Sequence, residues 1–143
     1  MIVYFNTSAI LPIVIEEPSS AVASRLWDEA DRVVSSRLVY AEGRAALAMA
    51  RRMSRVDARQ LRAAVRDFEA LHDQLDIVEV TEGLVRGAGA LAEQFALRGY
   101  DAFHLASARL VNDREMVLAA GDQSLLSAAR AVGIATANLI GQS

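Results

Sequence analysis

The 143-residue chain contains no cysteine and no lysine, and only two of its residues are proline. Without cysteine it forms neither a disulfide nor a thiolate metal site. All fifteen basic side chains are arginine, which excludes mechanisms that require a lysine, although a codon bias of the genome explains the imbalance equally well. No signal peptide is recognisable, and the longest apolar run, residues 9–15, is far below the ~20 residues of a membrane span. We therefore expect a cytoplasmic protein that does not bind membranes.

The chain has enough apolar residues for one core. Hydrophobic residues make up 53% of it, and a chain of this length normally forms one domain. No linker or internal repeat divides it, so we expect residues 1–143 to fold as a single domain. The net charge of −3 predicts no general attraction to nucleic acid.

Strand-like and helical patterns alternate along the chain. Short apolar runs indicate strands at residues 2–5, 33–36, 75–80, 116–120 and 134–140. Helical patterns occupy residues 9–15, 18–30, 38–53, 55–75, 82–98, 101–112 and 124–132, with Gly99 and Gly133 as expected stops. This alternation predicts an α/β fold with helices on both faces of a central, mainly parallel sheet of four to five strands.

The first expected strand ends abruptly in three small polar residues, Asn6, Thr7 and Ser8. In an open parallel sheet, ligands bind in the crevice at the carboxyl ends of the strands. We therefore expect Asn6 at the mouth of a binding site.

Three acidic residues have unusual surroundings. Asp101 opens an apolar helix and Asp122 follows the strand at 116–120, so each fits a helix N-cap. Glu42 is different, because its neighbours three and four residues away are all apolar: Leu38, Val39, Ala45 and Ala46. An ionised carboxylate there is costly unless it pairs with an arginine or binds a metal.

The topology favours a common location for these groups. Asn6 and Asp122 each follow an expected strand, while Glu42 and Asp101 lie near the starts of helices, and all these places meet at one edge of a parallel sheet. Carboxylates gathered without lysine repel one another, and Mg²⁺ or Mn²⁺ is the natural counter-charge. Such clusters support phosphodiester hydrolysis.

Four motifs in this order resemble the PIN domain, and within it the VapC toxins of bacterial type II toxin–antitoxin systems. They are Y-F-N-T-S-A at 4–9, Y-A-E-G-R at 40–44, Y-D-A-F-H-L-A-S-A at 100–108 and A-A-G-D-Q-S-L at 119–125. The resemblance extends over essentially the whole chain. It implies a PIN-like three-layer α/β/α fold and an endoribonuclease that depends on Mg²⁺ or Mn²⁺ and cleaves structured RNA such as tRNA or rRNA.

The resemblance also assigns residues and partners. The catalytic and metal-binding quartet falls on Asn6, Glu42, Asp101 and Asp122, and Ser8 is the hydroxyl residue expected to contribute to the site. The family further implies a homodimer and a VapB-type antitoxin whose C-terminal segment covers the site.

The chain departs from the family pattern at two positions. Asn6 stands where the family has aspartate; the amide keeps the shape but carries no charge and cannot act as a base, so we expect weak activity or none. Either a substitution introduced to silence a toxic nuclease or a natural inactive copy explains it. Ala120 replaces a frequent Ser or Thr, which removes only a hydroxyl contact.

Two further groups have both a functional and a structural interpretation. Arg55, Arg59, Arg62 and Arg66 form one stripe on the helix expected at 55–75. The stripe either binds phosphate or an acidic partner segment, or it is a solvated face neutralised by nearby acids.

His104 and three aromatic residues are the other ambiguous group. His104 lies three residues after Asp101 and either contacts the site or RNA or is simply a packed, hydrogen-bonded histidine. Trp27, Tyr100 and Phe103 are able to stack on RNA bases, although core or rim packing is the simpler interpretation.

Other function classes remain for comparison. A non-catalytic module that sequesters antitoxin or RNA accommodates Asn6 naturally. A receiver-like phosphoacceptor requires a lysine, which the chain lacks, and a dehalogenase-type phosphatase requires acids where Asn6 and Ser8 stand.

Overall fold

A five-stranded parallel sheet forms the centre of the computed structural model, which describes residues 1–111 and 114–140. The strand order in this part is β3-β2-β1-β4-β5, which confirms the expected parallel sheet. The strands are β1 (Ile2–Phe5), β2 (Arg32–Ser36), β3 (Asp76–Val78), β4 (Met116–Ala120) and β5 (Ala135–Asn138).

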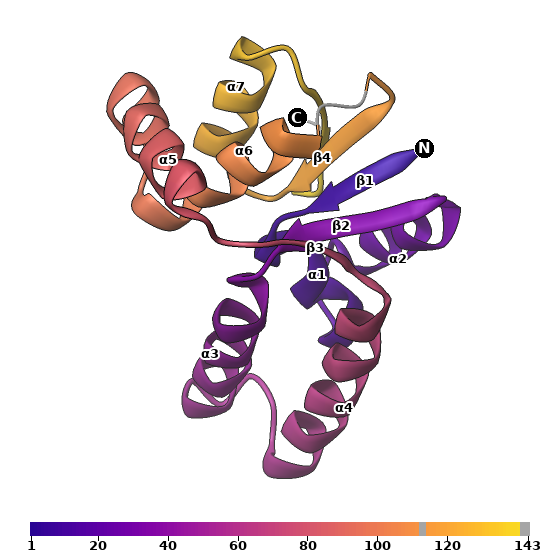
Figure 1. The fold of residues 1–143 in the computed structure, drawn as a ribbon. Coiled ribbons are helices and arrows are strands. Elements are labelled where there is room, and N and C mark those ends of the chain that lie inside the picture. The colour runs from indigo at the N-terminus through magenta and orange to yellow at the C-terminus, as the bar shows by residue number, and fades with distance from the viewer. Residues whose placement is uncertain (112–113, 141–143) are drawn as a thin grey trace.

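Helices cover both faces of the sheet and make three layers. Figure 1 shows α1 to α4 on one face and α5 to α7 on the other. Their bounds are α1 (Thr7–Val14), α2 (Ser20–Glu29), α3 (Val39–Arg52), α4 (Ala58–Gln74), α5 (Glu82–Phe95), α6 (Gly99–Val111) and α7 (Gln123–Ala131). Within the described ranges, each helix is too short or too polar to cross a membrane.

Alternating side chains of the central strands fill two separate cores. Val3 and Phe5 of β1 pack against the α1–α4 layer, whereas Tyr4 between them packs against the α5–α7 layer. In β4, Ala119 faces the first core and Leu118 the second. Burial on both faces explains why these strands are continuous apolar runs.

The helix after β1 begins earlier than expected. We predicted it at residue 9, but α1 starts at Thr7, because Asn6 alone has the extended N-cap conformation and its carbonyl already accepts a bond from Ala9 N (2.9 Å). Of the polar residues after β1, Asn6 is therefore the N-cap, and Thr7 and Ser8 lie in the first turn of α1.

The boundary between α5 and α6 also differs from the prediction. Helix α5 ends at Phe95, and Ala96 takes the left-handed conformation (φ 53°) that we expected of Gly99. This turn brings Leu97 into the core, where it is 8% exposed, so burial outweighs the conformational cost at Ala96. Gly99 instead lies in the first turn of α6, whose expected end at Asn112 is outside the described residues.

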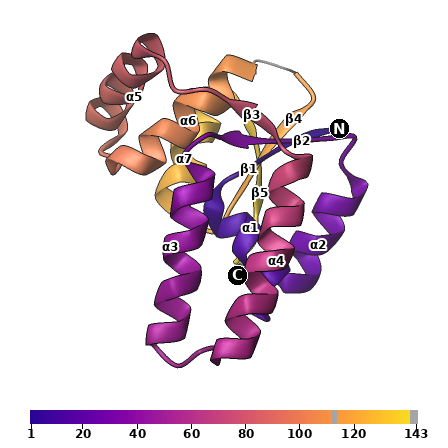
Figure 2. The same cartoon turned by 60° about the horizontal axis from the view of Figure 1, so that its bottom comes forward.

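Helices α3 and α4 form an antiparallel pair that projects from the sheet (Figure 2). Gly43 and Phe68 meet in this pair so closely that a Cβ at position 43 would overlap the Phe68 ring. Helix α4 starts at Ala58, after Asp57 and Gln60 close a capping box. Arg55 therefore precedes the helix, and the predicted four-residue stripe is wrong at that end.

Candidate active site at the carboxyl edge of the sheet

Asn6 lies at the carboxyl end of β1, beside the end of β4. Its backbone N donates to Ala119 O (3.0 Å), and its Nδ2 donates to Ser8 Oγ (2.7 Å). Ser8 Oγ also accepts a bond from Gly121 N (3.0 Å), one residue before Asp122. Ser8 thus joins the expected first site residue to the loop that carries the last one.

Asp122 follows β4 and caps α7, as the sequence predicted. Its Oδ1 accepts a hydrogen bond from Leu125 N (3.1 Å), while its Oδ2 lies 3.3 Å from Arg98 Nη2. Because one oxygen satisfies the helix, the other remains directed at a cation. Asp122 therefore caps α7 through Oδ1 and contacts the cation of Arg98 through Oδ2.

Asp101 lies in the first turn of α6 and is not its N-cap. Arg98 O accepts the bond from Ala102 N instead (3.0 Å), so the N-cap interpretation of Asp101 is wrong. The Asp101 side chain is 12% exposed, and its Oδ2 lies 3.2 Å from Arg98 Nε. Burial raises the pKa of Asp101, the charge of Asp122 raises it further, and Arg98 opposes both effects.

Arg98 therefore bridges the two aspartates. We did not predict this residue, although its position three residues before Asp101 was a usable signal. Its side chain is 82% exposed, so a short movement into solvent would free both carboxylates.

Glu42 pairs with a histidine and a threonine rather than with an arginine. Its Oε1 accepts a bond from Thr7 Oγ1 (3.0 Å) and lies 2.6 Å from His104 Nε2. His104 is on α6, one turn after Asp101, and so connects the Glu42 side of the site to the aspartate pair. Tyr4 lies at another edge of the ring, with its hydroxyl 2.8 Å from His104 Nδ1.

The predicted quartet thus lies at one edge of the sheet, but not around one point. Asp101 and Asp122 share Arg98, whereas Glu42 pairs with His104, which follows Asp101 by one turn of α6. Within residues 1–111 and 114–140, no three His, Asp or Glu side chains are grouped closely enough to hold one metal ion. The expected gathering of Glu42, Asp101 and Asp122 around one shared cation is therefore not found among these residues, because Arg98 pairs with the two aspartates and His104 with Glu42.

The donor atoms present nevertheless suit a hard divalent cation. Mg²⁺ is commonly held by one or two carboxylates, with water and substrate phosphate completing its ligands. Asp101 and Asp122 supply such a pair, and they already enclose one positive charge from Arg98. Glu42 Oε2 and Asn6 Oδ1 make no hydrogen bond with the described part of the chain, so no donor among the described residues competes with a ligand for these two oxygens.

The arginines of the α3–α4 pair lie outside this network. Arg55 pairs with Glu17 (2.8 Å). Arg59, Arg62 and Arg66 are exposed and have no ion pair within the described ranges. These three arginines therefore lie on a solvated face, and the binding of a phosphate or an acidic partner segment there stays a prediction.

The ambiguous aromatic residues separate into two classes. Trp27 is 8% exposed and packs against Phe5, so it belongs to the core. Phe103 is partly buried against the second core. Tyr100 is 63% exposed, next to Asp101, and is the one of the three that is available to a base.

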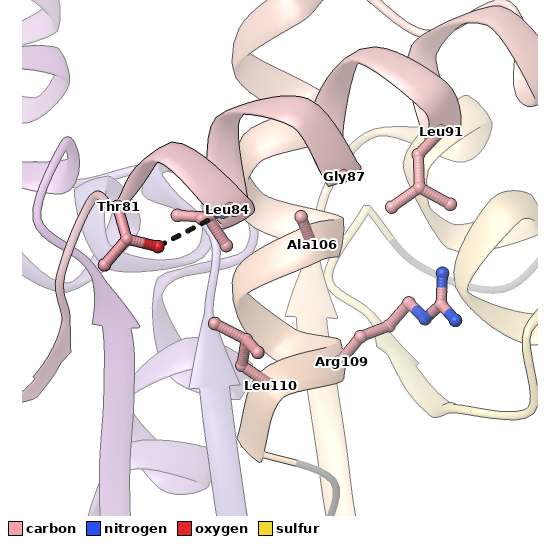
Figure 3. A pocket seen from close by; sticks show the side chains of 8 residues that line it. Thr81, Leu84, Gly87, Leu91, Ala106, Arg109 and Leu110 are labelled. Atoms are coloured by element: carbon pink, nitrogen blue, oxygen red, sulfur yellow. Dashed lines mark hydrogen bonds between the residues drawn. The ribbon is translucent and has the colours of Figure 1, made fainter.

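An apolar hollow of about 360 Å³ lies between α5 and α6, away from these polar groups. Figure 3 shows Leu84 and Leu91 of α5 facing Ala106 and Leu110 of α6, with Arg109 beside them. None of the predicted site residues lines it, so the hollow is a separate surface and not part of the carboxylate site.

Comparisons with known proteins agree with this architecture. The PIN-domain family model matches residues 3–132. The chain is 44% identical over 132 residues to Ribonuclease VapC49 of Mycobacterium tuberculosis, with 92% of each chain covered. The structure of PAE2754 from Pyrobaculum aerophilum superposes with a TM-score of 0.71 at 20% identity, over 95% of this chain and 92% of that one.

A second solved structure has the same fold. It is a toxin–antitoxin complex from Klebsiella pneumoniae, with a TM-score of 0.66 at 17% identity, over 96% of this chain and 97% of that one. The family match covers most of the sequence, and the expected membership is confirmed. The chain belongs to the PIN-domain family and is a VapC-type member of it.

Proposed function

We propose that this protein is a cytoplasmic endoribonuclease toxin that cleaves structured RNA, such as tRNA or rRNA, with the help of Mg²⁺ or Mn²⁺. The main observation is the Asp101–Asp122 pair at the carboxyl edge of the sheet, where two carboxylates enclose one cationic group. The curated relative named as a ribonuclease, 44% identical over nearly the whole chain, supports the same activity.

Each site residue has a defined task in this proposal. Asp101 and Asp122 would hold the ion, with Glu42 Oε2 as a further oxygen. When bound, the ion lowers the pKa of a water and neutralises charge that develops on the phosphodiester. Hydrolysis would leave a 5′-phosphate and a 3′-hydroxyl. Arg98, once it leaves the carboxylates, is placed to bind a substrate phosphate.

Asn6 is the weak point of this site. It offers one neutral oxygen where an aspartate would add a negative charge, so we expect the present chain to bind metal weakly and to cleave RNA slowly or not at all. An aspartate would fit without rearrangement, because the Ser8 hydroxyl is able to donate to a carboxylate while it still accepts from Gly121 N.

The decisive experiment is the Asn6→Asp substitution. We expect Mn²⁺-dependent RNA cleavage to rise at least about tenfold, which corresponds to 1.36 kcal/mol of barrier, and expression without antitoxin to become toxic. Sequencing of RNA ends after a pulse of this variant identifies the substrate. A folded Asn6→Asp protein that binds Mn²⁺ no better and cleaves no RNA would contradict the proposal.

Glu42→Gln in the Asn6→Asp background tests whether the Glu42 carboxylate contributes to cleavage. We expect cleavage to return to the low level of the unmodified chain, because the neutral amide removes a negative charge from the site. Glu82→Gln on α5 is the matched control, since that carboxylate is 80% exposed and pairs with Arg86, away from the site. Equal loss in both variants would indicate a nonspecific effect.

A non-catalytic module that sequesters antitoxin or RNA is the second candidate. The observation in its favour is the Asn6 Nδ2 bond to Ser8, which a carboxylate cannot donate. The codon at position 6 in the native genome distinguishes the two: an aspartate codon indicates a silenced nuclease, whereas an asparagine codon favours the binding module.

We also propose a VapB-type antitoxin as the partner. The K. pneumoniae structure, which shares the fold, is a toxin–antitoxin complex. Arg59, Arg62 and Arg66 on α4 are exposed and have no ion pair with the described residues, so they suit an acidic partner segment.

A homodimer is the oligomeric state that we propose. Leu110 lines the apolar hollow between α5 and α6 and is 62% exposed, and apolar surface of this kind favours association. We expect Leu110→Arg to reduce the dimer to a monomer in sedimentation measurements. Met53→Arg, at a similarly exposed position (64%) at the far end of α3, should leave the mass unchanged.

A further inference from the structure

His104 is fully buried, yet both of its ring nitrogens have polar partners. Nε2 lies 2.6 Å from Glu42 Oε1, and Nδ1 lies 2.8 Å from the Tyr4 hydroxyl. These side chains come from α6, α3 and β1, so the contacts connect three separate elements. One end of this chain of contacts is a core tyrosine, and the other is an acid of the candidate site.

The directions of the two hydrogen bonds follow from the partners. The oxygens of the Glu42 carboxylate accept hydrogen bonds, so the hydrogen between Glu42 Oε1 and His104 is carried by Nε2, and Nδ1 accepts from the Tyr4 hydroxyl. A neutral imidazole that accepts at Nδ1 carries its hydrogen on Nε2. His104 therefore donates to Glu42, and Tyr4 fixes the tautomer that makes this possible.

Glu42 receives a second donor at the same oxygen. Thr7 Oγ1 donates to Oε1 over 3.0 Å, so two hydrogen bonds hold this atom in place. Oε2 has no hydrogen bond to any of residues 1–111 or 114–140. The side chain is 21% exposed, which leaves Oε2 as the oxygen that remains for a ligand.

We propose that His104 is a positioning residue, which with Tyr4 and Thr7 holds Glu42 Oε1 so that Oε2 is presented to the divalent cation of the site. This inference rests on the proposed metal-dependent function. It differs from a packing role for His104, because packing requires only a side chain of similar volume and does not require a donor at the Nε2 position.

Two amide substitutions separate these roles. Glutamine reaches as far as the histidine Nε2, so His104→Gln keeps a donor for Glu42, whereas the shorter asparagine in His104→Asn reaches only the Nδ1 position. Each is introduced into the Asn6→Asp protein, and the dissociation constant for Mn²⁺ is measured by isothermal titration calorimetry. We expect His104→Asn to weaken Mn²⁺ binding about tenfold or more and His104→Gln to weaken it only a few-fold.

Tyr4→Phe is the second test, because it deletes one hydroxyl and keeps the ring. We expect an intermediate loss of Mn²⁺ affinity, since His104 loses the bond that fixes its tautomer. This variant decides the question if His104→Asn does not fold: reduced affinity supports the inference, and unchanged affinity overturns it. Equal affinities of His104→Asn and His104→Gln also overturn it.

The starting protein separates this inference from the proposed function. If Asn6→Asp itself does not bind Mn²⁺, the metal-dependent function fails and the role of His104 fails with it. If Asn6→Asp binds Mn²⁺ and His104→Asn binds it as tightly, only the role of His104 is wrong.

Discussion

Arg98 Nη2 lies 3.3 Å from Asp122 Oδ2, although the two residues are 24 positions apart and precede different helices, α6 and α7. The same guanidinium contacts Asp101 through Nε. An exposed arginine thus takes the position of the counter-charge between two site carboxylates, and any divalent cation must replace it or share the space with it.

Arg98→Gln should therefore make the protein more dependent on metal. Without metal, no positive charge then lies between the Asp101 and Asp122 carboxylates, which repel each other. We therefore expect a small loss of thermal stability at low salt. Added Mn²⁺ should raise the melting temperature of this variant more than that of the unmodified protein. Arg86→Gln, which removes a similarly exposed arginine from a helical pair on α5, should respond to Mn²⁺ like the unmodified protein. If Mn²⁺ raised the melting temperatures of both variants equally, the idea that the cation and Arg98 occupy the same position would be contradicted.

Asp122 allows its structural and its functional atom to be tested separately. Asp122→Asn keeps an oxygen for Leu125 N and should change the free energy of unfolding little, whereas Asp122→Ala loses the cap and should cost about 1 kcal/mol. Both should lose Mn²⁺ affinity, measured by calorimetry in the Asn6→Asp background, because both remove the charge at Oδ2. Retained affinity in Asp122→Asn would show that this carboxylate is only a cap.

Asp101 gives the metal-free protein a defined dependence on pH. Its pKa is raised above the ordinary 3.8, so its contribution to stability is present below that pH and is lost as the pH rises through the folded-state pKa. Asp101→Asn resembles the protonated form. Urea unfolding in EDTA should find this variant more stable than the unmodified protein at pH 7, and the difference should vanish as the pH falls below 3.8.

The control for Asp101 is Asp73→Asn, the same chemical change at an exposed position of α4, which should show no comparable pH-dependent difference. Saturating Mn²⁺ should make the unmodified protein more stable than Asp101→Asn at pH 7, because only the Asp101 carboxylate is stabilised by the cation. A less stable Asp101→Asn protein at pH 7 in EDTA would mean that the Arg98 pair outweighs the cost of burial.

The three exposed arginines of α4 should contribute to the affinity for RNA but not to the affinity for metal. Replacement of Arg59, Arg62 and Arg66 by glutamine should weaken RNA binding. The slope of the logarithm of the binding constant against the logarithm of the salt concentration should become shallower by about 0.7 for each lost single-strand phosphate contact. Mn²⁺ affinity should not change. The control carries the same charge change at scattered positions: Arg25, Arg86 and Arg130. An unaltered salt dependence would exclude RNA from this face and leave the acidic partner segment as its ligand.

The sequence by itself determined the sheet and its polar edge. Apolar runs buried on both faces predicted β1 and β4, and the cap at Asp122 was predicted correctly, because strand periodicity and helix capping depend on residues within a few positions of one another. The placement of Asn6 at the carboxyl end of β1 followed from the same local pattern.

Only the tertiary structure decided which side chains satisfy the acids. The partner of Glu42 is His104, 62 residues away, and the cation beside Asp122 is Arg98, 24 residues away. Such pairs depend on how α3, α6 and α7 pack on the sheet, and sequence patterns of short range do not contain that information. The turn at Ala96 has the same origin: the burial of Leu97 outweighed the local preference for glycine.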